Sequence, residues 1–179
     1  MTTLKELTHE SHEQAESHAF TKLLLSGTMS AAIYADFLYN QSAIYYSLEA
    51  MAKRKGLLNG LDGLERTVKI GDDFDNLQIE KVKLYPSTLR YINYITNRNL
   101  SDQQILAHIY VRHMGDLYGG QMIKKLVPGT PTMYDFENRK ELIDALRPRL
   151  DVSMGPEANE CFAYAIELFT ELANEYNIQ

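Results

Sequence analysis

Apolar residues recur at helical spacing along most of the chain, and no stretch shows the strict alternation expected of a half-buried strand. The pattern predicts an all-α protein with helices over about 3–18, 20–26, 30–54, 64–70, 88–96, 101–126, 135–150 and 156–176. Ser30 stands where the longest helix needs an N-cap, and Ser101 with Gln104 forms a capping box. We therefore expect a multi-helix fold without a sheet.

The stretch 108–125 has the pattern of a helix that is interrupted in its middle. Gly115, Gly119 and Gly120 fall within six residues, and each internal glycine costs a helix about 1 kcal/mol relative to alanine. Such a cluster predicts a kink, or a backbone left bare so that a large flat ligand can approach it. Close helix packing is the simpler explanation for a pair of glycines alone. Arg112 and Asp116 are four residues apart, so their side chains lie together beside the bare face.

Length, composition and charge narrow the class of protein. The 179 residues fit one domain, 1–179, and 45% hydrophobic with 23% charged residues is an ordinary globular balance. The net charge of −6 disfavours nucleic acid as the main partner. Cys161 is the single cysteine, which excludes an internal disulfide and a cysteine zinc cluster. With no secretory signal and no apolar run of the roughly 20 residues that span a bilayer, we expect a soluble protein of the cytoplasm or of a plastid stroma, without membrane partners.

Three of the five histidines, His9, His12 and His18, lie in the first predicted helix. Glu16 follows His12 by four residues, so its carboxylate can approach the imidazole. A metal-ligating histidine commonly has its second ring nitrogen held by such a group. Taken singly, each of these histidines is better explained as a surface residue.

Two motifs resemble a known family. The pattern Tyr-x-Arg-x-x-Gly-Asp-Leu-x-Gly-Gly-Gln at 110–121 resembles the distal-helix signature of the heme oxygenase family, with Tyr118 where the family usually has a serine. The pattern Lys-Glu-x-Thr-x-Glu-x-His-x-Gln-Ala-Glu at 5–16 is similar to the family's proximal helix. The resemblance covers nearly the whole chain and implies a single-domain, all-α heme oxygenase-like fold with a glycine-kinked distal helix.

The resemblance implies an enzyme that oxidises heme to biliverdin, as the IXα isomer, with release of ferrous iron and carbon monoxide. Heme would be both cofactor and substrate, and O2 the oxidant. His12 would be the proximal ligand of the heme iron, with Glu16 beside it. Gly115, Gly119 and Gly120 would let the distal backbone lie almost on the macrocycle.

The same resemblance gives Asp116 a catalytic role. Asp116 would hold waters, together with Arg112 and Tyr45, that deliver protons to the reacting oxygen. A core tyrosine with a satisfied hydroxyl is an equally good interpretation of Tyr45 by itself.

Basic residues are expected at the edge of the heme. Lys5 and Arg147 match positions that pair with the propionates and so fix the rotation of the heme in its plane. Tyr110 would also contact the heme. The family's second basic residue, one turn before Arg147, falls on Ile143, so that contact is missing or comes from elsewhere.

Electrons must come from outside, because the sequence holds no flavin or nicotinamide fingerprint. A soluble donor such as ferredoxin is expected. Lys124 and Lys125 match a family position that helps to dock the reductase, although two solvated lysines explain them equally well. A bilin reductase acting on the product is a further expected partner.

Two other functions remain open from the sequence. A non-catalytic heme carrier would share His12 but would not need Asp116. A di-iron oxygenase on a related helical fold would need two Glu-x-x-His motifs, and the chain has only the one that ends at His9. The lone Cys161 is better explained as a small buried residue than as a nucleophile.

Overall fold

The computed structural model describes residues 1–179, and its regular elements are all helical. The α-helices are α1 (Leu4–Leu7), α2 (His9–Ser17), α3 (Ala19–Leu24), α4 (Ala31–Arg54), α5 (Thr67–Asn76), α6 (Pro86–Asn97), α7 (Asp102–Ile109), α8 (Gly115–Tyr118), α9 (Gly120–Ile123), α10 (Arg139–Leu146) and α11 (Gly155–Glu175). One π-helical turn, η1 (Tyr110–Met114), and three 3₁₀ turns, η2 (Thr132–Tyr134), η3 (Arg147–Arg149) and η4 (Val152–Met154), complete the list. The predicted all-α fold is confirmed.

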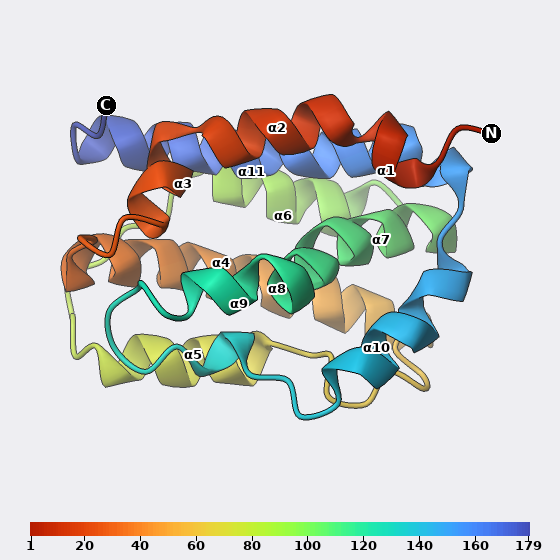
Figure 1. Cartoon of the computed structure of the whole chain (residues 1–179), viewed down its shortest axis with the longest axis horizontal. Coiled ribbons are helices and arrows are strands. Elements are labelled where there is room, and N and C mark those ends of the chain that lie inside the picture. The colour runs from red at the N-terminus through yellow and green to blue at the C-terminus, as the bar shows by residue number, and fades with distance from the viewer.

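The long helix α4 lies at the centre of the molecule (Figure 1), where it packs against α5, α6 and α7. It begins as predicted, because the Ser30 side chain accepts a 3.3 Å hydrogen bond from the backbone N–H of Ile33. Its apolar face enters the main core, where Leu38, Ile44 and Leu48 are completely or almost completely buried. α4 therefore gives the surrounding helices a common rigid support.

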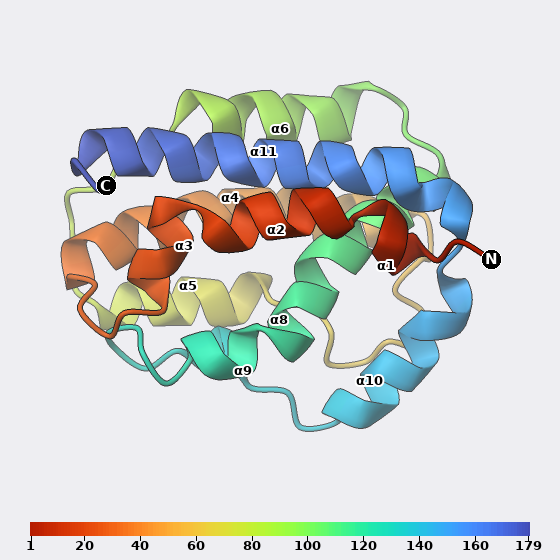
Figure 2. The ribbon, with the colours of Figure 1, turned by 45° about the horizontal axis from the view of Figure 1, so that its top comes forward.

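The first predicted helix is in fact two, α1 and α2, separated at Thr8. The hydroxyl of buried Thr8 donates a 3.0 Å hydrogen bond to the carbonyl of Leu4, and such back-bonding within a helix favours a bend. Thr3 and Glu6 form a capping box at the start of α1. The second helix, α2, then runs beside α11 (Figures 1 and 2), which carries the C-terminal part of the core.

Two predicted helices begin later than expected. α5 starts at Thr67 instead of residue 64 and continues to Asn76. α10 starts at Arg139 instead of residue 135 and ends before Pro148, in a 3₁₀ turn. The delay before α10 has a tertiary cause, because Nη1 of buried Arg66 donates hydrogen bonds to the carbonyls of Met133 and Asp135 at 3.1 and 2.8 Å. Because these carbonyls accept hydrogen bonds from Arg66, a helix that began at residue 135 would compete with Arg66 for them.

The interruption predicted in 108–125 is present, but its origin differs from the prediction. α7 passes into the π-helical turn η1, then into α8, and after a turn at Gly119 into α9; we call residues 110–123 the distal segment. Gly115 keeps helical angles, with φ −56° and ψ −46°, so this glycine is not the hinge. The change of direction visible in Figure 2 starts instead in the π-helical turn.

None of the helices combines the length and the apolar character that crossing a membrane requires.

Candidate active site

The distal segment and α4 bring together the two oxygens at the centre of the predicted site. The hydroxyl of Tyr45, on α4, donates a 2.6 Å hydrogen bond to Oδ2 of Asp116, on α8. Both side chains are buried. Burial raises the pKa of Asp116 to about 6, although the Tyr45 hydrogen bond and the charges of His113, Arg66 and Arg112 act in the opposite direction. The carboxyl can therefore both release and take up a proton near neutral pH.

Arg112 lies in the π-helical turn and is buried beside the same pair. Its Nε donates to the hydroxyl of Tyr91 at 3.2 Å, and its Nη1 donates to Oε1 of Gln41 at 3.2 Å. Its Nη2 is buried without a hydrogen-bond partner. Its guanidinium also lies 5.9 Å from the centre of the Tyr45 ring. A buried donor without a partner implies that an acceptor, such as an ordered water or a ligand, belongs there.

The three glycines of the distal segment serve different purposes. A Cβ added to Gly115 would meet nothing within 4 Å, so this backbone faces open space. A Cβ on Gly119 would approach only the carbonyl of Gly115, at 3.4 Å. A Cβ on Gly120 would lie 2.4 Å from the ring of Tyr134, so Gly120 allows close packing inside the protein. The bare face expected for a flat ligand is therefore formed by Gly115 and Gly119, while Gly120 contacts the core.

His12 lies on the exposed side of α2, with 53% of its side chain accessible. Its Nδ1 is 3.6 Å from Oε2 of Glu16, which leaves Nε2 without a protein partner. The edge of the ring packs against Phe162 of α11, with centroids 5.9 Å apart. An accessible imidazole with a carboxylate near one ring nitrogen and the other nitrogen free resembles the arrangement of a metal-ligating histidine.

The remaining predicted contacts are distributed around this region. Lys5 is exposed on α1, and its ammonium makes no ion pair within the chain. Tyr110 is half-buried and packs against a small cluster that includes Leu4 and Met154. Lys124 pairs with the carboxylate of Asp135, whereas Lys125 is exposed and unpaired.

Tyr118, the departure from the expected motif, lies between two arginines. Nη2 of Arg147 donates a 3.2 Å hydrogen bond to its hydroxyl, and the guanidinium of Arg139 lies 5.2 Å from the centre of its ring. Ile143, the residue aligned with a basic position, is 6% exposed and belongs to the main core. The second positive charge at Tyr118, besides that of Arg147, is therefore that of Arg139, one turn before Ile143.

Sequence reasoning missed a buried polar chain that supports Arg112. The hydroxyl of Tyr91 lies 2.7 Å from Nδ1 of His108 and 3.2 Å from Sγ of Cys161, and Nε2 of His108 lies 2.9 Å from Oε1 of Glu157. The buried state of Cys161 agrees with its predicted role. One signal was available, because His108 and Arg112 are four residues apart and share a face of the predicted helix. Nothing in the sequence pointed to Glu157.

The alternative di-iron site finds no support in the geometry. No three His, Cys, Asp or Glu side chains are grouped so that they could hold a metal ion. His9, the histidine of the single Glu-x-x-His motif, instead faces Glu13 at 3.2 Å on the surface of α2.

The residues present fit a flat, anionic, iron-containing ligand. α8 and α9 lie in front of α4 in Figure 1, and α2 lies in front of it in Figure 2. α2 offers an accessible imidazole, the distal segment offers open space over Gly115, and Lys5 and Arg147 are exposed cations. The buried, unpartnered Nη2 of Arg112 and the Asp116 carboxyl add a polar group that can exchange protons beside the bare backbone.

Comparison with known proteins gives a consistent result. The family model described as heme oxygenase matches residues 1–144. The chain is 27% identical to a heme oxygenase of Rhodella violacea, over 97% of this chain and 86% of the relative. It is 25% identical to heme oxygenase 1 of Synechocystis sp., over 94% of this chain and 82% of the relative.

Solved structures show the same helical arrangement. Heme oxygenase-1 from the cyanobacterium Synechocystis sp., solved in complex with heme, superimposes with a TM-score of 0.80 at 26% identity, over 96% of this chain and 91% of that one. The heme oxygenase from Leptospira interrogans gives a TM-score of 0.80 at 26% identity, over 94% of this chain and 97% of that one. Because the family model covers most of the chain and the fold agrees, the chain belongs to the heme oxygenase family.

Proposed function

We propose that this heme oxygenase, which cleaves heme to biliverdin, binds its heme between His12 and the bare face of Gly115 and Gly119. Nε2 of His12 would ligate the heme iron, with the Glu16 carboxylate 3.6 Å from the other ring nitrogen. The open space at Gly115 allows the distal backbone to approach the macrocycle closely.

The observation that carries the proposal is the buried Tyr45–Asp116 hydrogen bond beside that open face. The bound heme supplies an iron atom that activates O2. The protein must then deliver protons to one side of the ligand, and a carboxyl with a pKa of about 6 can do so near neutral pH. Tyr45 orients the carboxyl, and Nη2 of Arg112 is placed to hold a water beside it. A heme carrier would have no use for this group.

The propionates supply the orientation of the heme. Lys5 and Arg147 pair with them, and Tyr118 positions Arg147 through its hydroxyl. Arg139, stacked on Tyr118, supplies the charge that Ile143 lacks. Fixing the in-plane rotation presents one meso carbon for attack, which we propose gives the IXα isomer.

The electrons come from a soluble donor such as ferredoxin. Lys125 is the more available of the two lysines after the distal segment, because Lys124 is held by Asp135. An acidic donor docked there would lie close to the distal segment. A bilin reductase would then consume the product.

One experiment tests the function directly. Hemin is added to the purified protein, the visible spectrum is recorded, and a ferredoxin reducing system is added in air. A histidine-ligated Soret band that decays into the broad red absorption of biliverdin, with the product isomer identified by chromatography, is the expected result. A band that stays stable with several donors would indicate a heme carrier. No Soret shift would reject heme binding altogether.

A further inference from the structure

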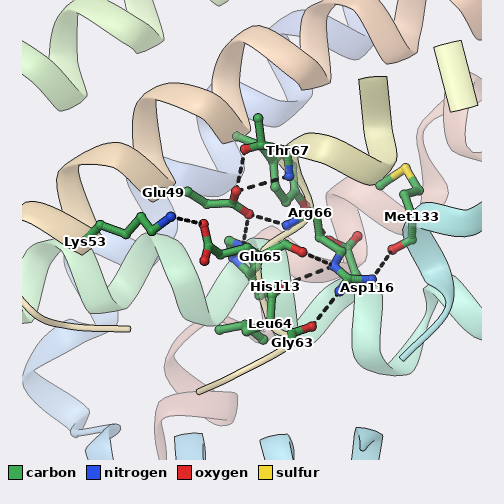
Figure 3. Close-up of polar contacts among 11 residues, drawn as sticks. Glu49, Lys53, Gly63, Leu64, Glu65, Arg66, Thr67, His113, Asp116 and Met133 are labelled. Atoms are coloured by element: carbon green, nitrogen blue, oxygen red, sulfur yellow. Dashed lines mark hydrogen bonds and ion pairs between the residues drawn. The ribbon is translucent and has the colours of Figure 1, made fainter. Parts of the chain in front are cut away.

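A buried histidine and a buried glutamate form a pair whose histidine lies close enough to Asp116 for its charge to act on that carboxyl. Nε2 of His113, in the π-helical turn, is 2.9 Å from Oε1 of Glu49 on α4 (Figure 3). The side chain of His113 is 0% exposed and that of Glu49 is 3% exposed. A charged group so deeply buried is costly unless it is paired and hydrogen-bonded.

Glu49 has a structural role that does not require the histidine. Its carboxylate accepts hydrogen bonds from the backbone N–H groups of Arg66 and Thr67, at 2.6 and 3.1 Å, and from the Thr67 hydroxyl. These donors lie at the start of α5, whose N-cap residue Arg66 makes no side-chain capping bond. The Glu49 carboxylate therefore supplies the capping acceptor from α4. Burial alone would raise the pKa of Glu49, but the hydrogen bonds from His113, Thr67 and Arg66 lower it. Glu49 is therefore an anion that already has three donors besides His113.

The other nitrogen of His113 has no partner. Nδ1 is buried and makes no hydrogen bond. The ring packs against Tyr45, with centroids 5.1 Å apart, and Tyr45 is the residue that donates to Asp116. Asp116 itself follows His113 by three residues and lies beside it in Figure 3. A hydrogen-bond donor to Glu49 needs only Nε2, so the free Nδ1 is the feature that this role leaves unexplained.

We propose that His113, held by Glu49, is a positioning residue that takes up a proton from solvent and thereby favours the ionised form of Asp116. His113 takes up the proton at Nδ1 while Nε2–H remains donated to Glu49. The resulting cation stabilises the Asp116 carboxylate after Asp116 has released its own proton, and no proton passes between the two residues. The proposal rests on the proposed function only in assigning proton delivery to Asp116.

Several other groups face His113 and Asp116 and affect the pKa of the Asp116 carboxyl. Tyr45 approaches from α4, Arg112 from the π-helical turn, and Arg66 from the residue before α5. Tyr134, from η2, completes the buried surroundings of the carboxyl. His113, Arg66 and Arg112 all act on Asp116 as nearby charges that favour its anion.

The test is a carboxyl titration on the protein without heme. Asp116 Cγ is followed by ¹³C NMR from pH 4 to pH 9 in the wild type, in His113→Gln and in Glu65→Gln. Glutamine at position 113 keeps a donor for Glu49 but cannot take up a proton. Glu65→Gln is the matched control, because the Glu65 side chain pairs with Lys53 at the surface, at 2.8 Å, and not with His113 or Glu49 (Figure 3).

We expect His113→Gln to raise the titration midpoint of Asp116 by about one pH unit, since the variant loses a nearby positive charge. Glu65→Gln should leave it unchanged. A folded His113→Gln protein with an unchanged Asp116 midpoint would overturn the proposal and leave His113 as a structural donor.

If His113→Gln does not fold, a second measurement on the wild type tests the proposal. ¹⁵N NMR of the wild-type imidazole reports directly whether Nδ1 of His113 takes up a proton between pH 8 and pH 5. An Nδ1 that stays unprotonated over this range would also overturn the proposal. Both measurements are made without heme, so their outcome is independent of whether the wild type converts hemin to biliverdin.

Discussion

Gly115 and Gly120 lie five positions apart in one segment and face opposite environments. Open space lies beside Gly115, whereas the ring of Tyr134 lies against Gly120. The motif that contains both glycines therefore has two physical requirements, one for the ligand and one for the core, and substitution can separate them.

Gly120→Ala should destabilise the fold. Its Cβ would lie 2.4 Å from Cδ1 of Tyr134, and both residues are buried, so the ring or the backbone must move. Overpacking of this kind costs about 1–3 kcal/mol. Chemical denaturation with urea would measure the loss. Unchanged stability would show that Tyr134 can move aside freely.

Gly115→Ala should keep the stability of the fold and weaken the binding of hemin. The new methyl group meets no protein atom within 4 Å, and alanine favours a helix by about 1 kcal/mol over glycine, so stability should not fall. Hemin affinity should fall by about tenfold, because the methyl group occupies the space of the macrocycle. Gly71→Ala is the control, since Gly71 lies within α5 and also faces open space. Tight hemin binding by Gly115→Ala would place the heme elsewhere.

Asp116→Asn should stabilise the protein at high pH. The pKa of Asp116 is raised from 3.8 to about 6 by burial, so the folded state binds the proton more tightly than the unfolded state does. Stability of the wild type should therefore fall as pH rises from about 4 to about 6. Asparagine has no such dependence and should be more stable by up to about 3 kcal/mol at pH 8. Urea denaturation at pH 4, 6 and 8 measures the free energy of unfolding of both proteins. A stability difference between variant and wild type that does not shrink toward pH 4 would contradict the prediction.

His12→Ala should abolish the spectrum of imidazole-ligated heme without destabilising the fold, because the side chain is 53% exposed. His9→Ala is the matched control, since His9 is also paired with a glutamate four residues later, at 3.2 Å. Free imidazole should restore the spectrum of His12→Ala. If only His9→Ala loses the spectrum, the ligand assignment is wrong.

Arg147→Ala should weaken hemin binding by about threefold to tenfold, through loss of a charge-assisted contact with a propionate. It should not affect binding of hemin dimethyl ester, which has no carboxylates. Lys140→Ala is the control, because Lys140 is an exposed cation on the same helical stretch that pairs with Asp144 at 3.0 Å. Equal weakening for both ligands would mean that Arg147 acts through protein structure. Absorbance titration supplies all these affinities.

Local signals predicted most of the fold. Ser30 and Ser101 cap the helices that they were expected to cap, because an N-cap depends on contacts within a few residues. The start of α5 was misplaced because its cap, Glu49, is 18 positions away from Thr67 in the chain. A helix boundary set by such a distant side chain has no local sequence signature.

The residues of the site also divide into those that local motifs predict and those that only the fold brings together. Motif spacing named Asp116, Arg112 and Tyr45, and the structure brings Tyr45 and Asp116 into contact across 71 positions. His113 was missed because, in the sequence, it is one polar residue inside a motif already explained by its neighbours. Its partner Glu49 is 64 positions away and lies on a different helix. Tyr118 was noticed, but its contact with Arg147 depends on how α8 and η3 are placed in space.

The π-helical turn accommodates one residue more than an α-helix would hold in the same length. Arg112 and His113 are neighbours in the chain, yet their side chains are both buried, at 8% and 0% exposure, whereas consecutive residues of an α-helix point about 100° apart. Removing one residue between Ile109 and Gly115 would restore a regular helix with the flanking residues in place, so Arg112 and His113 would lose the turn that buries both side chains. Point substitutions in this turn would alter the site by degrees, but a single deletion would remove the local geometry that places Arg112 and His113 against Tyr45.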